Sequence, residues 1–159
     1  MTTEQPSSPP PTPSAPSAGG APAVAPVQIV AGLGAIALIV SALLNWQDVL
    51  GHTAKGTDVP VEFLVDKGVI TGDPSILIAL AIAGAMVIVG LFLPQLRVLA
   101  ILGGALGVIV VVLYCVQVQR LIDSSTTDIG LFDFIAIGTY IAFVGGIAAV
   151  VGSALARRA

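Results

Sequence analysis

Charged side chains are scarce in this 159-residue chain, and four long stretches contain none at all. Lys and Arg together number 6, Asp and Glu number 9, and 56% of the sequence is hydrophobic. The four uncharged stretches are approximately Val27–Leu44, Ser75–Leu93, Val98–Val116 and Phe134–Leu155. Each has about the 20 residues that a helix needs to cross the hydrocarbon core of a bilayer. We therefore expect an all-α fold, a membrane bundle of four spanning helices.

The lack of charge inside these stretches also argues against several functions. Ion paths and proton relays usually depend on intramembrane Asp, Glu, Lys, Arg or His, and the four stretches contain none. A net charge of −3 without a basic cluster argues against nucleic-acid binding. The spans and their connections occupy nearly the whole chain, so there is no room for a separate soluble catalytic domain.

Cysteine and histidine are nearly absent as well. Cys115 is the single cysteine, so no intrachain disulfide can form, and its place in the third stretch favours a packing role. His52 is the single histidine, and the carboxylates around it have neither zinc nor calcium spacing. No nucleophile with a base, phosphate-binding loop or HExxH pattern is present. We predict no metal site, no cofactor and no enzymatic activity.

Residues 1–26 differ in composition from the rest of the chain. They are dominated by Pro, Ser, Ala, Thr and Gly, and Glu4 is their only charged residue. Such a segment buries too little apolar surface to offset its chain entropy, so we predict a disordered tail followed by a transmembrane domain over 27–159. Its prolines favour polyproline II, which a partner could bind, although a plain flexible tail is the simpler interpretation. The tail lacks the basic start of a signal peptide, so the first stretch should remain as a helix.

The first loop, Asn45–Pro74, contains short apolar stretches at Val49–Leu50 and Val59–Val65. Turn-forming residues at Ala54–Asp58 separate them, which favours a small β-hairpin, with an irregular loop as the alternative. Trp46 follows the first span directly, a position typical of interfacial aromatic residues that anchor a protein in the membrane surface.

Basic residues beside the spans predict the orientation. Four spans place both termini on one side, together with Arg97, Arg157 and Arg158, which lie directly next to the membrane. Lys and Arg in such positions are typical of the cytoplasmic side. We therefore predict a plasma-membrane protein with cytoplasmic termini, with these arginines as interface anchors and with loops 45–74 and 117–133 extracytoplasmic.

Small residues recur at four-residue spacing in the last two spans, which allows helix backbones to approach closely. The rows either pack the four helices against one another or offer a docking face to a partner, and the two rows of the last span leave one for a partner. The candidate residues are Gly103, Gly107, Gly138, Ala142, Gly145, Gly146 and Ala149.

Taken together, the proline-rich tail, the four spans and Trp46 resemble the small four-helix (tetraspan) membrane proteins common in actinobacteria. The resemblance covers the whole chain and includes a motif in the first loop formed by Val59, Pro60, Phe63, Leu64 and Asp66. It implies a role like that of the accessory subunits of larger envelope or respiratory assemblies. The outline is also similar to the claudin-like tetraspan proteins, whose paired loop cysteines are absent here.

Two functions remain open at this point. The first is a non-catalytic accessory or scaffold subunit that binds membrane lipid and a larger membrane-protein complex. The second is a small transporter or channel that acts as a homo-oligomer. The absence of intramembrane charge favours the first.

Overall fold

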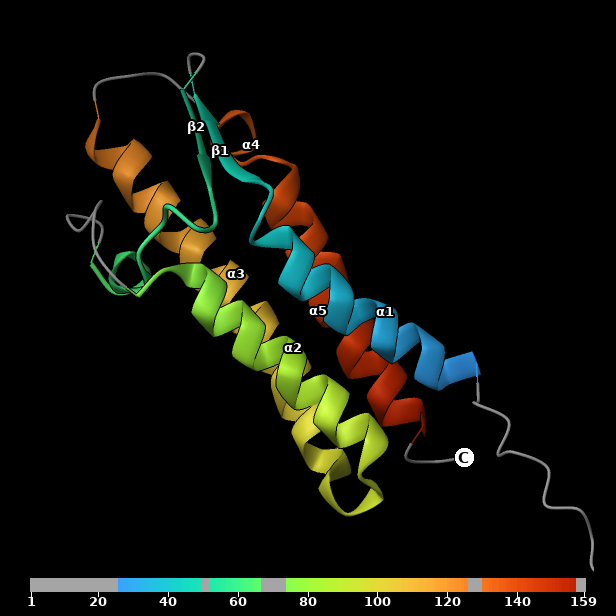
Figure 1. Ribbon diagram of the computed structural model, residues 1–159. Coiled ribbons are helices and arrows are strands. Elements are labelled where there is room, and N and C mark those ends of the chain that lie inside the picture. The colour runs from blue at the N-terminus through green and yellow to red at the C-terminus, as the bar shows by residue number, and fades with distance from the viewer. Residues whose placement is uncertain (1–25, 50–51, 67–73, 126–129, 157–159) are drawn as a thin grey trace, which may run out of the picture.

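The computed structural model describes residues 26–49, 52–66, 74–125 and 130–156. The described chain is mostly helical (Figure 1). Its long helices are α1 (Pro26–Ser41), α2 (Ile76–Phe92), α3 (Arg97–Ser124) and α5 (Ile137–Ala156). The connections contain β1 (Asn45–Val49), β2 (His52–Lys55) and the short helices η1 (Val61–Leu64), η2 (Pro94–Leu96) and α4 (Leu131–Phe134).

The four long helices form a bundle in which each packs mainly on two neighbours. α1 contacts α5 and α2, while α3 contacts α2 and α5, and the α1–α5 contact is the most extensive. Consecutive helices run in opposite directions (Figure 1). The start of α1, the end of α5 and the α2–α3 connection therefore lie at one end, called here the terminal end. The opposite end carries β1 and β2 and is called the hairpin end.

Prolines mark two helix boundaries. Pro26 is the first residue of α1, where its missing N–H costs no helical hydrogen bond. Leu93 ends α2 in an extended conformation because the following Pro94 disfavours the helical one. The short helix η2 then leads directly into α3, which keeps α2 and α3 adjacent and antiparallel.

The third helix is longer than the sequence suggested. It has 28 residues and continues to Ser124, so residues 117–124 are helical where we expected a loop. Gln and Arg are good helix formers, and the Gln119 side chain donates a 2.8 Å hydrogen bond to Asp123 one turn further on. Part of the remaining connection forms α4, and α5 begins at Ile137.

A small antiparallel hairpin is present in the first loop, but its second strand is not the one that the sequence predicted. Strand β1 pairs with β2 in a register that places Asp48 opposite Thr53 and Val49 opposite His52. Residues 50–51, between the two strands, lie outside the described residues. Val59–Val65 does not pair as a strand of this hairpin: it includes helix η1, and Pro60 forms only an isolated bridge to Ser75.

The predicted turn at Ala54–Asp58 follows β2 instead of joining the two strands. The Asp58 carboxylate accepts the backbone N–H of Lys55 at 3.1 Å, and the N–H of Gly56 donates to the carbonyl of Leu44. Asp commonly stabilises turns in this way because its short side chain can accept a nearby backbone N–H. The turn directs the chain back across the bundle end to η1.

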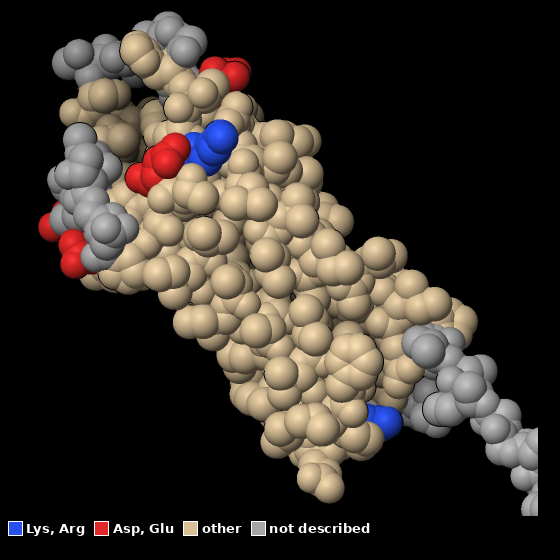
Figure 2. Space-filling model, viewed as in Figure 1, with Lys and Arg blue, Asp and Glu red and all other residues tan. Residues whose placement is uncertain are grey.

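Large apolar side chains cover the outside of the bundle. Leu33, Ile82 and Val144 are 61%, 51% and 65% exposed, and every long helix has several such residues. Figure 2 shows this uncharged surface between the ends, with charged side chains gathered at the hairpin end. By length and composition, Pro94–Ser124 and Ile137–Ala156 are candidate membrane spans, and α1 and α2 are shorter apolar helices.

Small residues occupy the contacts between helices. A Cβ atom added to Gly34 of α1 would lie 2.6 Å from backbone atoms of Gly145 and Ala149 in α5. A Cβ atom added to Gly103 of α3 would lie 2.5 Å from the backbone oxygen of Ala83 in α2. Glycine is required at both positions because backbone atoms of the facing helix leave no room for a side chain.

A pair of glycines on α1 tests the importance of this contact. We expect Gly34→Ala to destabilise the bundle by about 1–3 kcal/mol, the usual cost of overpacking a tight interface. Gly32→Ala is the matched control, because a Cβ atom there meets nothing within 4 Å. It should stabilise the helix by about 0.5–1 kcal/mol, since alanine loses less backbone entropy. Unfolding of both variants in mixed micelles measures the difference, and equal stabilities would contradict the packing account.

Candidate functional site

One buried carbonyl oxygen joins three parts of the chain at the hairpin end. The backbone oxygen of Trp46, in β1, accepts hydrogen bonds from the N–H of Ala136 at 3.0 Å and the hydroxyl of Tyr114 at 3.2 Å. The hydroxyl of Thr139 donates to the same oxygen at 3.3 Å. A carbonyl oxygen has two lone pairs, so the three donors share them. β1 is thereby fixed to both α3 and α5.

The Trp46 side chain is part of the same cluster. Its indole ring is fully buried, and Nε1 donates a 2.8 Å hydrogen bond to the carbonyl of Ser41 near the end of α1. The ring meets Tyr114 edge to face at 5.0 Å between centroids, and Tyr114 also packs on Phe63 at 5.9 Å. The prediction that Trp46 is an interfacial anchor is wrong, because the ring is fully buried against Tyr114 and the backbone of Gly138.

The Gln117 side chain fixes the part of the first loop that contains η1. Its side-chain amide donates hydrogen bonds to the carbonyls of Leu64 at 3.1 Å and Val65 at 2.8 Å, at the end of η1. Gln117 is 4% exposed, so these bonds satisfy an amide group that would otherwise be buried without partners. Sequence reasoning placed this residue in a loop and missed its role. The feature of the sequence that could have indicated this role is the position of the glutamine, which continues the apolar face of α3.

The structure places the candidate small residues inside the bundle. Gly103 faces α2, Gly146 faces Val108 and Gly104 of α3, and Gly145 faces Ala37 and Gly34 of α1. The remaining members are equally enclosed, with contacts to Leu38 or Trp46 or with no exposed surface: Gly107, Gly138, Ala142 and Ala149. The prediction that one of the two rows on α5 faces a partner is wrong, because α1 and α3 cover both.

Of the predicted arginine anchors, the structure describes one. Arg97 is exposed and begins α3 at the terminal end. Arg157 and Arg158 lie outside the described residues, as do residues 1–25 of the predicted tail.

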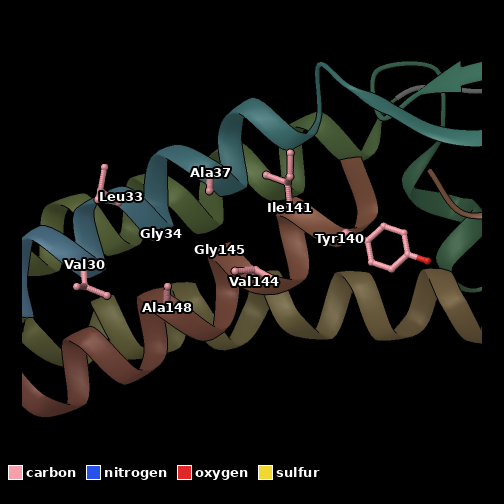
Figure 3. A pocket seen from close by; sticks show the side chains of 9 residues that line it. All are labelled: Val30, Leu33, Gly34, Ala37, Tyr140, Ile141, Val144, Gly145 and Ala148. Atoms are coloured by element: carbon pink, nitrogen blue, oxygen red, sulfur yellow. The ribbon is translucent and has the colours of Figure 1, made fainter. Parts of the chain in front are cut away.

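A first apolar groove runs between α1 and α5 (Figure 3). It has a volume of about 440 Å³, and its lining comes from Val30 to Ala37 on α1 and Tyr140 to Ala148 on α5. Leu33, Val144 and Tyr140 form the exposed rim, and Gly34 and Gly145 lie where the two helices meet. None of the described residues that line this groove is charged.

A second groove of about 410 Å³ lies between α3 and α5 beneath α4. It is lined by Val112 and Cys115 of α3, by Phe132 of α4 and by Thr139 and Phe143 of α5, among others. Tyr140 lines both grooves and is 42% exposed, so it separates them on the surface of α5. Cys115 is half-buried in this lining, so it packs within the groove as a small apolar side chain.

The side-chain donors of Trp46, Tyr114, Gln117 and Thr139 all bond backbone carbonyls, so this cluster links elements of the fold. Within the described residues, no group of three or more His, Cys, Asp and Glu side chains is placed to hold a metal ion. Comparison with protein-family models, with curated proteins and with solved structures found no match to this chain.

Substitutions of two nearby glutamines on α3 test whether the Gln117 amide fixes η1 to the bundle. Gln117→Leu leaves the carbonyls of Leu64 and Val65 without their donor, and we expect a local loss of about 1–3 kcal/mol. Gln119→Leu is the matched control, since Gln119 is exposed and, among the described residues, its side chain donates to Asp123 alone. Hydrogen exchange at residues 61–66 should accelerate in the first variant alone. Unchanged exchange in Gln117→Leu would show that the amide does not fix η1.

Proposed function

We propose that the chain crosses the plasma membrane four times. Its helices α1 and α2 have 16 and 17 residues, which corresponds to about 24–26 Å of helix. The apolar residues Leu43, Leu44 and Leu93 extend these lengths toward the thickness of a hydrocarbon core, roughly 27–33 Å. The exposed apolar side chains around all four helices support this topology, because water would solvate such a surface poorly.

The orientation we propose has cytoplasmic termini. Arg97 lies at the terminal end, directly beside the apolar surface, where basic residues favour the cytoplasmic side. The hairpin, η1 and the end of α3 then form a small extracytoplasmic head. The hydrogen bonds of Trp46 and Gln117 hold the head to the bundle.

We further propose that the protein is a non-catalytic accessory or scaffold subunit of a larger membrane complex. The observation that carries this proposal is the α1–α5 groove, an uncharged concave surface on the side of the bundle. Its occupant in the proposal is one transmembrane helix of the partner. The rim residues Leu33 and Val144 form ridges of the kind that interdigitate with a facing helix.

Labelling of two engineered cysteines tests the topology. In a Cys115→Ala background, we expect a membrane-impermeant maleimide to modify Thr53→Cys in intact cells, because Thr53 is exposed on the hairpin. Gln95→Cys, exposed in η2 at the terminal end, should react only after lysis. Reaction of both sites in intact cells would contradict the orientation. Recovery of the protein in the soluble fraction would contradict membrane insertion itself.

A bulky side chain in the groove tests the partner proposal. We expect Ala148→Trp, on the groove lining, to reduce partner recovery at least tenfold when the tagged protein is purified from membranes in mild detergent. Ile82→Trp on the exposed surface of α2 is the control and should retain the partner. Equal recovery with both variants would refute docking through this groove. A partner-free homo-oligomer that passes solutes in proteoliposomes would favour the transporter alternative.

A further inference from the structure

The Ser153 hydroxyl is the one buried side-chain polar atom of the described residues that has no hydrogen-bond partner. Ser153 lies near the end of α5 and is 5% exposed. An unsatisfied buried hydroxyl lowers stability, so such groups are normally paired with protein, water or a ligand. The Ser153 hydroxyl is therefore available to bond a group from outside the described chain.

Ser153 lines a cavity where all four long helices meet at the terminal end. α1 contributes Gln28, α3 contributes Arg97, and the other lining residues are Gly90, Leu91, Ala100 and Ala156. The cavity has a volume of about 10 Å³, which is close to the space needed by one water molecule or one oxygen atom. It therefore admits an oxygen of a ligand, while the rest of that ligand lies outside.

The polar groups around this cavity are suited to an anion. Arg97 carries a fixed positive charge, and the side chains of Gln28 and Ser153 both carry donors. Within the described residues, neither Gln28 nor Arg97 has an ion pair or a side-chain hydrogen bond, and no carboxylate lines the cavity. Arg97 is exposed at the mouth, so its guanidinium is available for bidentate contact with an oxyanion.

We infer that Gln28, Arg97 and Ser153 bind a phosphate group, one oxygen of which enters the cavity and accepts a hydrogen bond from the Ser153 hydroxyl. The group belongs either to an anionic phospholipid or to free phosphate. The place favours the lipid, because the cavity opens at the end of the apolar surface, where headgroups lie in the proposed topology. The preference for a lipid rests on the proposed membrane insertion. The binding of a phosphate group by these three residues does not depend on it.

Thermal unfolding of the full-length protein in nonionic detergent tests the site. Dioleoylphosphatidylglycerol should stabilise the protein more than dioleoylphosphatidylcholine does. Arg97→Gln and Ser153→Ala should each raise the phosphatidylglycerol concentration needed for half of this stabilisation at least tenfold. Ser153→Ala removes one charge-assisted hydrogen bond, and Arg97→Gln removes the positive charge and its bidentate contact. Lys55→Gln removes a positive charge from the exposed hairpin and should leave the effect unchanged.

Ser153→Ala also separates binding from a structural role. Without lipid, this variant should be as stable as the original protein or more stable, because it removes an unpaired buried hydroxyl. With phosphatidylglycerol, the original protein should be more stable than Ser153→Ala. Lower stability of Ser153→Ala in both conditions would show that the hydroxyl only supports the fold, and would overturn the inference.

A second titration identifies the source of the phosphate. If inorganic phosphate alone gives the same stabilisation with the same dependence on Arg97 and Ser153, the site stands and the ligand is free phosphate. If neither phosphate nor phosphatidylglycerol acts through these residues, the cavity holds only water and the inference fails. Membrane insertion is measured separately by fractionation and labelling, so failure here leaves the four-span proposal intact.

Discussion

Close contact between the backbones of neighbouring helices is the constraint on which this structure depends. Many large apolar side chains are exposed on the outside, and glycine and alanine occupy many of the positions where helices meet. In lipid, burying apolar surface gives little drive for association, and packing at short distance must hold the helices together. The Gly34 and Gly145 contact between α1 and α5 is the clearest case, because backbone atoms of one helix occupy the space of a side chain on the other.

The hairpin end adds a second kind of stabilisation that the bundle alone lacks. Here the chain leaves the regular helices, and its backbone groups need partners. The hydroxyls of Tyr114 and Thr139 donate to the Trp46 carbonyl, and the Gln117 amide donates to the Val65 carbonyl. These bonds link the loop to α3 and α5. The polar residues of this region thus hold the head on the bundle, and the proposed interactions use the α1–α5 groove and the cavity at Ser153.

The number and approximate position of the long helices could be predicted because uncharged stretches bounded by proline or charge set them. The extension of α3 could not, since Gln117 and Arg120 end the apolar pattern while their helix continues with support from η1. The small-residue rows were recognised, but a row alone does not reveal whether a helix of the same chain covers it. The cavity at Ser153 was not predictable, because its lining comes from four helices and joins Gln28 near the start of α1 to Ser153 near the end of α5.

Spin labels on the outer surface test the central claim, that lipid solvates this bundle, most directly. In a Cys115→Ala background reconstituted in vesicles, single labels at Ile82 and Ile109 probe exposed positions within α2 and α3, and a label at Thr53 probes the hairpin. The account predicts that dissolved oxygen relaxes the labels at Ile82 and Ile109 far more than a water-soluble nickel chelate does, and that Thr53 shows the opposite. Equal access of the nickel chelate to Ile82, Ile109 and Thr53 would mean that water surrounds the bundle, which would contradict the account.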